Sequence, residues 1–200
     1  MNRILVWDLP TRAFHWLLAL SFAGAFLTAE SEKFRDIHVM LGYTMLGLVG
    51  FRLLWGFVGT RYARFASFAY GPRAVLRYLG SVAKLRPEHH LGHNPAGSWA
   101  IYLLLGLTLA AGVTGLAAYN DFGGELFEEL HEGLSNAMLA VVAVHVAGVL
   151  ASSLLHGENL AKSMVTGYKR GEPVLGIRRA HWLMGFGVLA GVLGFWVRFA

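Results

Sequence analysis

The stretch from Leu130 to Leu150, LHEGLSNAMLAVVAVHVAGVL, decides how the rest of the chain is interpreted. It is apolar enough to cross a lipid bilayer as a helix, yet it carries two histidines, His131 and His145. Fourteen residues at about 100° each return the second imidazole to within about 40° of the first, about 21 Å further along the helix axis. Polar side chains at such depths are costly in lipid, so both histidines are candidate functional residues.

The composition of the chain agrees with a membrane protein. Of its 200 residues, 56% are hydrophobic and 14% are charged, whereas a soluble domain has about 25% charged residues. The absence of cysteine excludes disulfides, thiolate zinc sites, iron–sulfur clusters and thioether-attached haem. The net charge of +5 is what the basic loops of a membrane protein produce, so we expect no nucleic-acid partner.

We expect an all-α integral membrane bundle that forms one domain over residues 1–200. A helix needs about 20 apolar residues to cross about 30 Å of hydrocarbon. The predicted spans cover residues 11–29, 37–58, 98–119, 131–155 and 180–199. The first four form a core bundle over residues 11–155, residues 156–179 form a segment on the inner surface, and residues 180–199 add a fifth helix. Asn94 and Pro95 are typical of a helix start, and residues 65–79 predict an amphipathic surface stretch.

The loops carry a strong charge asymmetry. Thirteen basic residues fall on one side of the predicted bundle: Arg3, Arg12, Arg61, Arg64, Arg73, Arg77, Lys84, Arg86, Lys162, Lys169, Arg170, Arg178 and Arg179. The other side has three, Lys33, Arg35 and Arg198, and its loop at residues 120–130 is acidic. The positive-inside rule therefore predicts a cytoplasmic N-terminus and a C-terminus outside.

The predicted helices place histidines at two depths. His38 starts the second span, so it lies near the outer surface at the level of His131. His15 is in the first turns of the first span, so it lies near the inner surface at the level of His145. Two histidines without a third ligand suit a metal already held in a plane, as in haem, because bare zinc takes three or four protein ligands. Two bis-histidine haems, one above the other, account for the four histidines.

Two arginines lie near the predicted inner site. Arg52 follows His38 by fourteen residues, so it shares the same helix face about 21 Å further inward. A guanidinium there suits an anionic haem propionate, and Arg12, one turn before His15, suits the same role. Arg52 also has a purely structural interpretation, as a charge paired with a backbone carbonyl. The glycines Gly42, Gly47 and Gly50 leave room for a flat macrocycle.

Four segments together resemble the bacterial cytochrome b561 and hydrogenase b-type cytochrome family. They are VWDLPTRAFHWLLALSF from Val6, IHVMLGY…FRLLWGFVG from Ile37, GHNPAG from Gly92, and the stretch quoted above. The resemblance covers residues 3 to about 170 and implies haem b in the bacterial inner membrane, with His15, His38, His131 and His145 as axial ligands. The fifth helix departs from the four-helix members and looks more like the hydrogenase-type members.

The resemblance implies a dihaem cytochrome in the lipid membrane that transfers electrons between the quinone pool and a periplasmic c-type cytochrome or hydrogenase-type partner. His156 and Trp16 are candidate quinone contacts, since His156 lies about 16 Å inward of His145. One alternative is a haem b anchor subunit of a hydrogenase-type complex. Another is a superoxide:quinone oxidoreductase, which the acidic outer loop disfavours because it repels an anionic substrate. Whether the chain is itself an enzyme stays open.

Structural interpretations remain for all these histidines. His131, His15 and His38 lie near bilayer edges, where interfacial histidines occur, and His145 suits a hydrogen bond inside the bundle. We interpret the other histidines as solvated or interfacial: His89, His90, His93 and His181. A non-redox membrane protein such as a small transporter needs neither the paired histidines nor Arg52, and the sequence has no internal repeat of the kind transporters often show.

Overall fold

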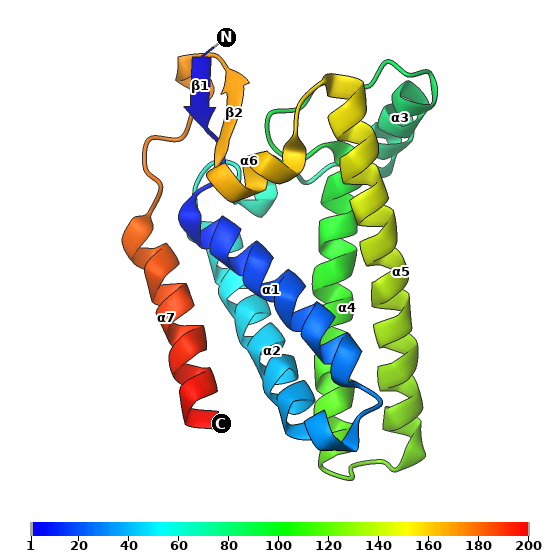
Figure 1. Ribbon diagram of the computed structural model, residues 1–200. Coiled ribbons are helices and arrows are strands. Elements are labelled where there is room, and N and C mark those ends of the chain that lie inside the picture. Colours follow the sequence, from blue (N-terminus) through cyan, green and yellow to red (C-terminus); the bar gives the residue numbers. More distant parts are fainter. Residues whose placement is uncertain (1, 200) are drawn as a thin grey trace.

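The computed structural model describes residues 2–199, and α-helices make up most of them (Figure 1). The α-helices are α1 (Leu9–Thr28), α2 (Arg35–Val58), α3 (Pro72–Ala83), α4 (Pro95–Tyr119), α5 (Glu125–His156), α6 (Leu160–Thr166) and α7 (Trp182–Phe199). Two strands, β1 (Asn2–Leu5) and β2 (Tyr168–Gly171), and three short 3-10 helices, η1 (Glu32–Phe34), η2 (Phe65–Ser67) and η3 (Pro173–Leu175), complete the described elements.

Four helical segments between residues 2 and 199 are long and apolar enough to cross a membrane. They cover Glu32–Val58, Pro95–Tyr119, Glu125–His156 and Trp182–Phe199, and they coincide with four of the five predicted spans. α1 has 20 residues but is not among them. Arg12 and His15 lower the mean hydropathy of its first half.

The long helices pack in neighbouring pairs. α1 packs on α2, α2 on α4, and α4 on α5, while α7 lies against α1 and α2. The sheet, α3 and α6 lie at one end of the bundle, and the connections α1–α2 and α4–α5 lie at the other (Figure 1). The buried core joins Phe14 of α1, Leu48 and Val49 of α2, and Leu105 of α4. The helices that hold the predicted histidine pairs, α5 with α1 and α5 with α2, are not among the closely packed pairs.

Helix α5 is longer than the sequence predicts. It begins at Glu125 rather than at His131, after Gly124 with a φ of +60°. Glu125 and Glu128 lie in its first turn, where carboxylates interact favourably with the helix dipole. Hydropathy finds only the apolar part of such a helix, and here the polar first turns continue the same helix.

A small antiparallel sheet accompanies the helices of the predicted all-α bundle. β1 pairs with β2 with Asn2 opposite Gly171 and Leu5 opposite Tyr168. Each strand has four residues, and their partners lie far apart in the sequence, so no local pattern announces them. The sheet ties the start of the chain to the segment before α7.

The start of α4 agrees with the prediction. Asn94 caps the helix, and its Oδ1 accepts a hydrogen bond from the Gly97 backbone N–H at 2.7 Å, with Pro95 in the first turn. The predicted amphipathic surface stretch contains the start of α3, which begins at Pro72. Both elements position the polar loop between them.

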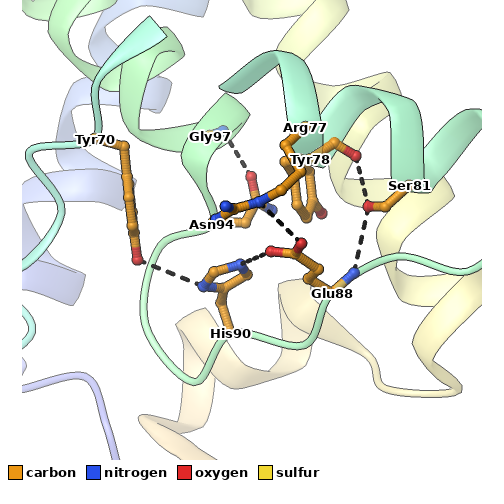
Figure 2. A network of polar contacts seen from close by, with 8 residues as sticks. All are labelled: Tyr70, Arg77, Tyr78, Ser81, Glu88, His90, Asn94 and Gly97. Atoms are coloured by element: carbon orange, nitrogen blue, oxygen red, sulfur yellow. Dashed lines mark hydrogen bonds and ion pairs between the residues drawn. The ribbon is translucent and has the colours of Figure 1, made fainter. Parts of the chain in front are cut away.

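The loop between α3 and α4 is held by a polar network rather than left in solvent (Figure 2). Glu88 pairs with Arg77 of α3 at 3.2 Å and lies 3.9 Å from the His90 ring. His90 Nδ1 lies 3.4 Å from the hydroxyl of Tyr70. Burial lowers the pKa of His90, although the nearby Glu88 opposes this effect. His90, expected to be solvated or interfacial, is thus a partly exposed member of this network, with 22% of its side chain exposed.

Candidate functional site

The structure brings His38 of α2 and His131 of α5 together. Their ring centres are 6.0 Å apart and the rings are nearly perpendicular, at 85°. His38 Nδ1 lies 2.8 Å from the carbonyl oxygen of Ala25, and His131 Nδ1 lies 2.8 Å from that of Ala111. Each ring is thus oriented by the backbone of a neighbouring helix.

These two contacts fix the tautomer of both imidazoles. A carbonyl oxygen only accepts hydrogen bonds, so Nδ1 carries the proton in each ring. Nε2 is then left with its lone pair, which is the form in which imidazole binds a metal. A backbone carbonyl behind a ligating histidine also fixes the ring orientation and raises its basicity. His38 and His131 are therefore prepared as ligands by their surroundings.

A cavity of about 400 Å³ contains both histidines. Its walls include Gly42, Gly112 and Gly115, and a Cβ added at Gly42 meets no atom within 4 Å. A Cβ at Gly115 comes within 2.8 Å of the His131 ring. The glycines therefore provide open space on α2 and allow the imidazole to lie flat against α4.

The cavity fits the group that the sequence predicts. The ring centres, 6.0 Å apart, leave room for one metal ion bound by a nitrogen of each imidazole, as in the haem that the sequence predicts. Arg35 and Tyr119 also line this cavity, and a guanidinium suits a propionate. Between residues 2 and 199, no group of three or more His, Asp or Glu side chains is arranged to hold a bare metal ion.

The second predicted pair lies toward the other end of the bundle. His15 lies near the start of α1 and His145 in the second half of α5, both toward the end of the bundle that carries the sheet (Figure 1). His15 Nδ1 is buried and has no hydrogen-bond partner among the described residues. The Trp16 ring stands edge-on to His15, with ring centres 5.1 Å apart. An imidazole with an unsatisfied buried nitrogen suits a ligand that completes its bonding.

Arg52 lies near this inner pair and is buried, with 2% of its surface exposed. Its guanidinium lies over the ring of Phe65 at 4.7 Å and near that of Phe68 at 5.9 Å. Its Nη1 is buried without a hydrogen-bond partner within residues 2–199. This geometry gives no support to the interpretation of Arg52 as a charge paired with a backbone carbonyl, and it leaves a donor for an anionic group.

His93, expected to be solvated or interfacial, belongs to the same region. Its ring packs between Trp7 and Phe68, with ring centres 4.7 Å from each. Burial among these groups, with the positive charges of Arg52 and Lys169, lowers the pKa of His93 to about 3, so its imidazole is neutral at physiological pH. His93 is the residue directly before the Asn94 cap. Side chains at this position often pack inward against the helix start, so the sequence did contain a signal that His93 is packed.

Arg12, Trp16 and His156 take other contacts. Arg12 Nη1 donates to the carbonyl of Val165 at 2.6 Å, while its Nε is buried without a partner in the described residues. Trp16 Nε1 donates to the carbonyl of Met164 at 3.3 Å. Both side chains thus hold α6 against α1. His156 Nε2 is also buried without such a partner.

Asp8 is a further polar residue of this end of the bundle, and it is not among the residues predicted from the sequence. Asp8 is fully buried and caps α1 by accepting from the Thr11 backbone N–H at 2.8 Å. Its other oxygen accepts from Trp55 Nε1 at 3.1 Å and from the Thr60 hydroxyl at 2.5 Å. The signal was Asp8 followed by Pro10, the same combination of cap and early proline that identified the start of α4.

Comparison with known proteins identifies the family of this chain. The family model described as prokaryotic cytochrome b561 matches residues 6–167. The probable Ni/Fe-hydrogenase B-type cytochrome subunit of Rhizobium leguminosarum bv. viciae is 24% identical in an alignment that covers 82% of this chain and 87% of the relative. Its counterpart in Azotobacter vinelandii is 25% identical, with 83% and 88% covered.

A third relative is the probable Ni/Fe-hydrogenase 1 B-type cytochrome subunit of Escherichia coli K12, which is 28% identical in an alignment that covers 58% of this chain and 60% of the relative. No solved structure matches the chain. The family match spans the segments that contain all four paired histidines, Arg52 and His93. The chain therefore belongs to the prokaryotic cytochrome b561 family.

Proposed function

We propose that this chain is a dihaem b-type cytochrome that carries electrons between the quinone pool and a redox partner on the outer side of the membrane. The family accounts for haem b, membrane integration and electron transfer. The main structural support for a bis-histidine haem site is the His38–His131 pair. The two ring centres are 6.0 Å apart, and both Nδ1 atoms are hydrogen-bonded to backbone carbonyls.

Haem b, when bound, supplies a one-electron carrier whose potential depends on its axial ligands and surroundings. His38 and His131 are the proposed axial ligands of the outer group, and His15 and His145 those of the inner group. The carbonyls of Ala25 and Ala111 hold the two outer rings in one orientation, so little rearrangement accompanies a change of charge.

Arg52 is the proposed partner of an inner haem propionate. Its buried Nη1 has no hydrogen-bond partner within residues 2–199, and a buried guanidinium is strongly stabilised by an anionic oxygen. Arg12 offers a second donor through its Nε, which also has no partner in the described part of the chain. A propionate between these donors would satisfy groups that the protein alone leaves unsatisfied.

In this proposal α1 is a fifth membrane span, since it packs along α2 and its length of 20 residues matches the hydrocarbon thickness. The basic loops lie at the cytoplasmic side of the bacterial inner membrane, and the C-terminus lies in the periplasm. Quinone binds at the inner end, where the Nε2 of His156, which has no hydrogen-bond partner among residues 2–199, offers a polar contact and Trp16 an aromatic one.

The relatives' names favour a hydrogenase-type partner over a c-type cytochrome. All three relatives described above are named as subunits of Ni/Fe hydrogenases. A haem b subunit that anchors a hydrogenase-type complex is therefore the second candidate function. Purification of the native complex in mild detergent distinguishes the two, because an anchor subunit copurifies with a large hydrogenase-type subunit at a fixed ratio.

Substitution of single ligands tests the dihaem proposal. We expect two haems b per chain in the parent and about one in each of the variants His131→Ala and His145→Ala. The two variants should lack different components of the parent's redox titration. His89→Ala is the matched control, since 54% of the His89 side chain is exposed, and it keeps both haems. A parent with a single haem, or a ligand variant that retains both, refutes the assignment.

A further inference from the structure

A pocket of about 420 Å³ lies apart from both histidine pairs, where α2 ends and α7 begins. It is lined by Thr60, Arg61, Ile177, Arg178, Arg179 and His181. We propose that this pocket binds the phosphodiester headgroup of an anionic phospholipid, with preference for a lipid that carries two phosphates. The proposal does not depend on the proposed redox function.

The charge of the pocket selects an anion. Three arginines from two separate segments converge on it, and no carboxylate is among its lining residues. Within residues 2–199, none of the three guanidinium groups has a carboxylate within ion-pair distance. Arginine matches phosphate oxygens through paired N–H donors. The dipole of α7, an 18-residue helix that begins directly after His181, adds partial positive charge.

The segment that presents two of the arginines is fixed at both ends. The Ile177 backbone N–H donates to the carbonyl of Leu5 at 2.8 Å, and the carbonyl of Ala180 accepts from the Leu9 backbone N–H at 2.8 Å. Arg178 and Arg179 lie between these two anchors. Their backbone positions are thus set by the fold, which reduces the entropy lost when a ligand binds.

The opposite wall is fixed as well. The Thr60 hydroxyl donates to the buried carboxylate of Asp8 at 2.5 Å, and the ring of His181 stands edge-on to Trp55 at 5.4 Å. Asp8 is a negative charge behind this wall. Both of its oxygens already accept hydrogen bonds from protein groups, and it does not line the pocket. The pocket surface itself remains cationic.

The position of the pocket indicates a lipid rather than a soluble anion. α2 and α7 both belong to candidate membrane spans, and the pocket lies just beyond Val58 and just before Trp182, where the two spans end. Val58 is 76% exposed, Trp182 58% and Leu183 91%, so apolar side chains next to the pocket are available to acyl chains. Basic pockets between membrane helices at the cytoplasmic level are suited to such headgroups. The three guanidinium groups carry three positive charges, whereas one phosphodiester carries a single negative charge. This difference favours a lipid with two phosphodiesters.

Native mass spectrometry of the purified full chain in detergent tests the proposal. The parent is titrated with cardiolipin, which has two phosphodiesters, with phosphatidylglycerol, which has one, and with zwitterionic phosphatidylcholine. We expect binding to weaken in that order. The pocket variant is Arg61→Gln/Arg178→Gln/Arg179→Gln. A basic side chain beside an anionic headgroup contributes about fivefold in affinity, so we expect about a hundredfold weaker cardiolipin binding in this variant.

The control variant is Arg73→Gln/Arg86→Gln/Arg170→Gln, which removes the same charge from exposed arginines outside the pocket. We expect less than a threefold change in it. Equal weakening in both variants, or cardiolipin binding that survives in the pocket variant, overturns the proposal. Inorganic phosphate that displaces cardiolipin at equal concentration identifies a free anion as the ligand and overturns the lipid assignment. Arg179→Gln alone, expected to weaken binding about fivefold, serves as a milder second variant if the triple variant does not fold.

Discussion

The substitution Gly115→Ala tests the outer site through the residue behind the ligand. The new Cβ lies 2.8 Å from both Cε1 and Nδ1 of the His131 ring. Ordinary contact requires the ring to retreat by about 0.6 Å, and this movement also strains the hydrogen bond to the Ala111 carbonyl. Metal–ligand distances tolerate only about 0.2 Å. The substitution therefore displaces His131 by about three times the tolerance of a metal bond.

The expected cost follows from this overlap. Overpacking by one methyl group typically costs about 1–3 kcal/mol, which corresponds to about a 5- to 150-fold loss of affinity for the outer haem. If His131 were a free side chain, rotation of its ring would relieve the overlap at little cost. The size of the loss in haem affinity therefore indicates whether the His131 ring is held both by the Ala111 carbonyl and by the haem iron.

The assay compares haem content per chain and the redox titration of Gly115→Ala with those of Gly106→Ala. A Cβ at Gly106, on the same helix, meets no atom within 4 Å, so the control keeps the haem content of the parent. We expect Gly115→Ala to lose the outer component and keep the inner one. Haem content and potentials equal to those of the control would refute the reasoning.

Two further predictions concern buried polar groups. Asp8→Asn replaces an acceptor oxygen by a donor in a fully buried helix cap. Because hydrogen bonds to a charged group contribute about 1.5–3 kcal/mol each, we expect a lower midpoint of thermal unfolding. An unchanged midpoint contradicts the role of Asp8 as a cap. Glu158 pairs with the buried Lys169 at 3.4 Å, and burial lowers the pKa of Lys169 while Glu158 opposes the shift. In Glu158→Gln that opposition is lost, so the folded chain binds fewer protons than the unfolded chain between the lowered pKa and about 10.5. We expect lower stability at pH 7 that is partly recovered as the pH rises toward that value; a loss that stays constant with pH contradicts this.

Helices and their caps could be predicted from the sequence because they rest on local physics. The apolar stretches give the spans, and Asn94 with Pro95 gives the start of α4. The extra turns of α5 escape hydropathy, because Glu125 to Leu130 form helix outside the apolar part. The β1–β2 pairing escapes every local pattern, since each strand has four residues and the partners meet only in the folded chain.

The outer histidine pair could be anticipated from depth alone, and the structure brings His38 and His131 together. The depth of the two histidines in the bilayer does not predict the hydrogen bond from each ring to a backbone carbonyl. These acceptors belong to other helices, so they are known only once the helices have packed. His93 shows the opposite failure. A histidine in a polar loop suggests solvent, but the neighbouring cap directs it between Trp7 and Phe68.

The pairing of β1 with β2 has a consequence for the order in which the molecule is completed. A ribosome must synthesise residue 171 before the first strand finds its full partner, and the closing of so long a loop adds only a modest entropic cost. His38 and His131 precede that point, so the far end of the bundle is free to assemble while the near end still awaits its last segment. The first strand therefore gains its sheet partner only after most of the chain, including the four paired histidines, has been synthesised.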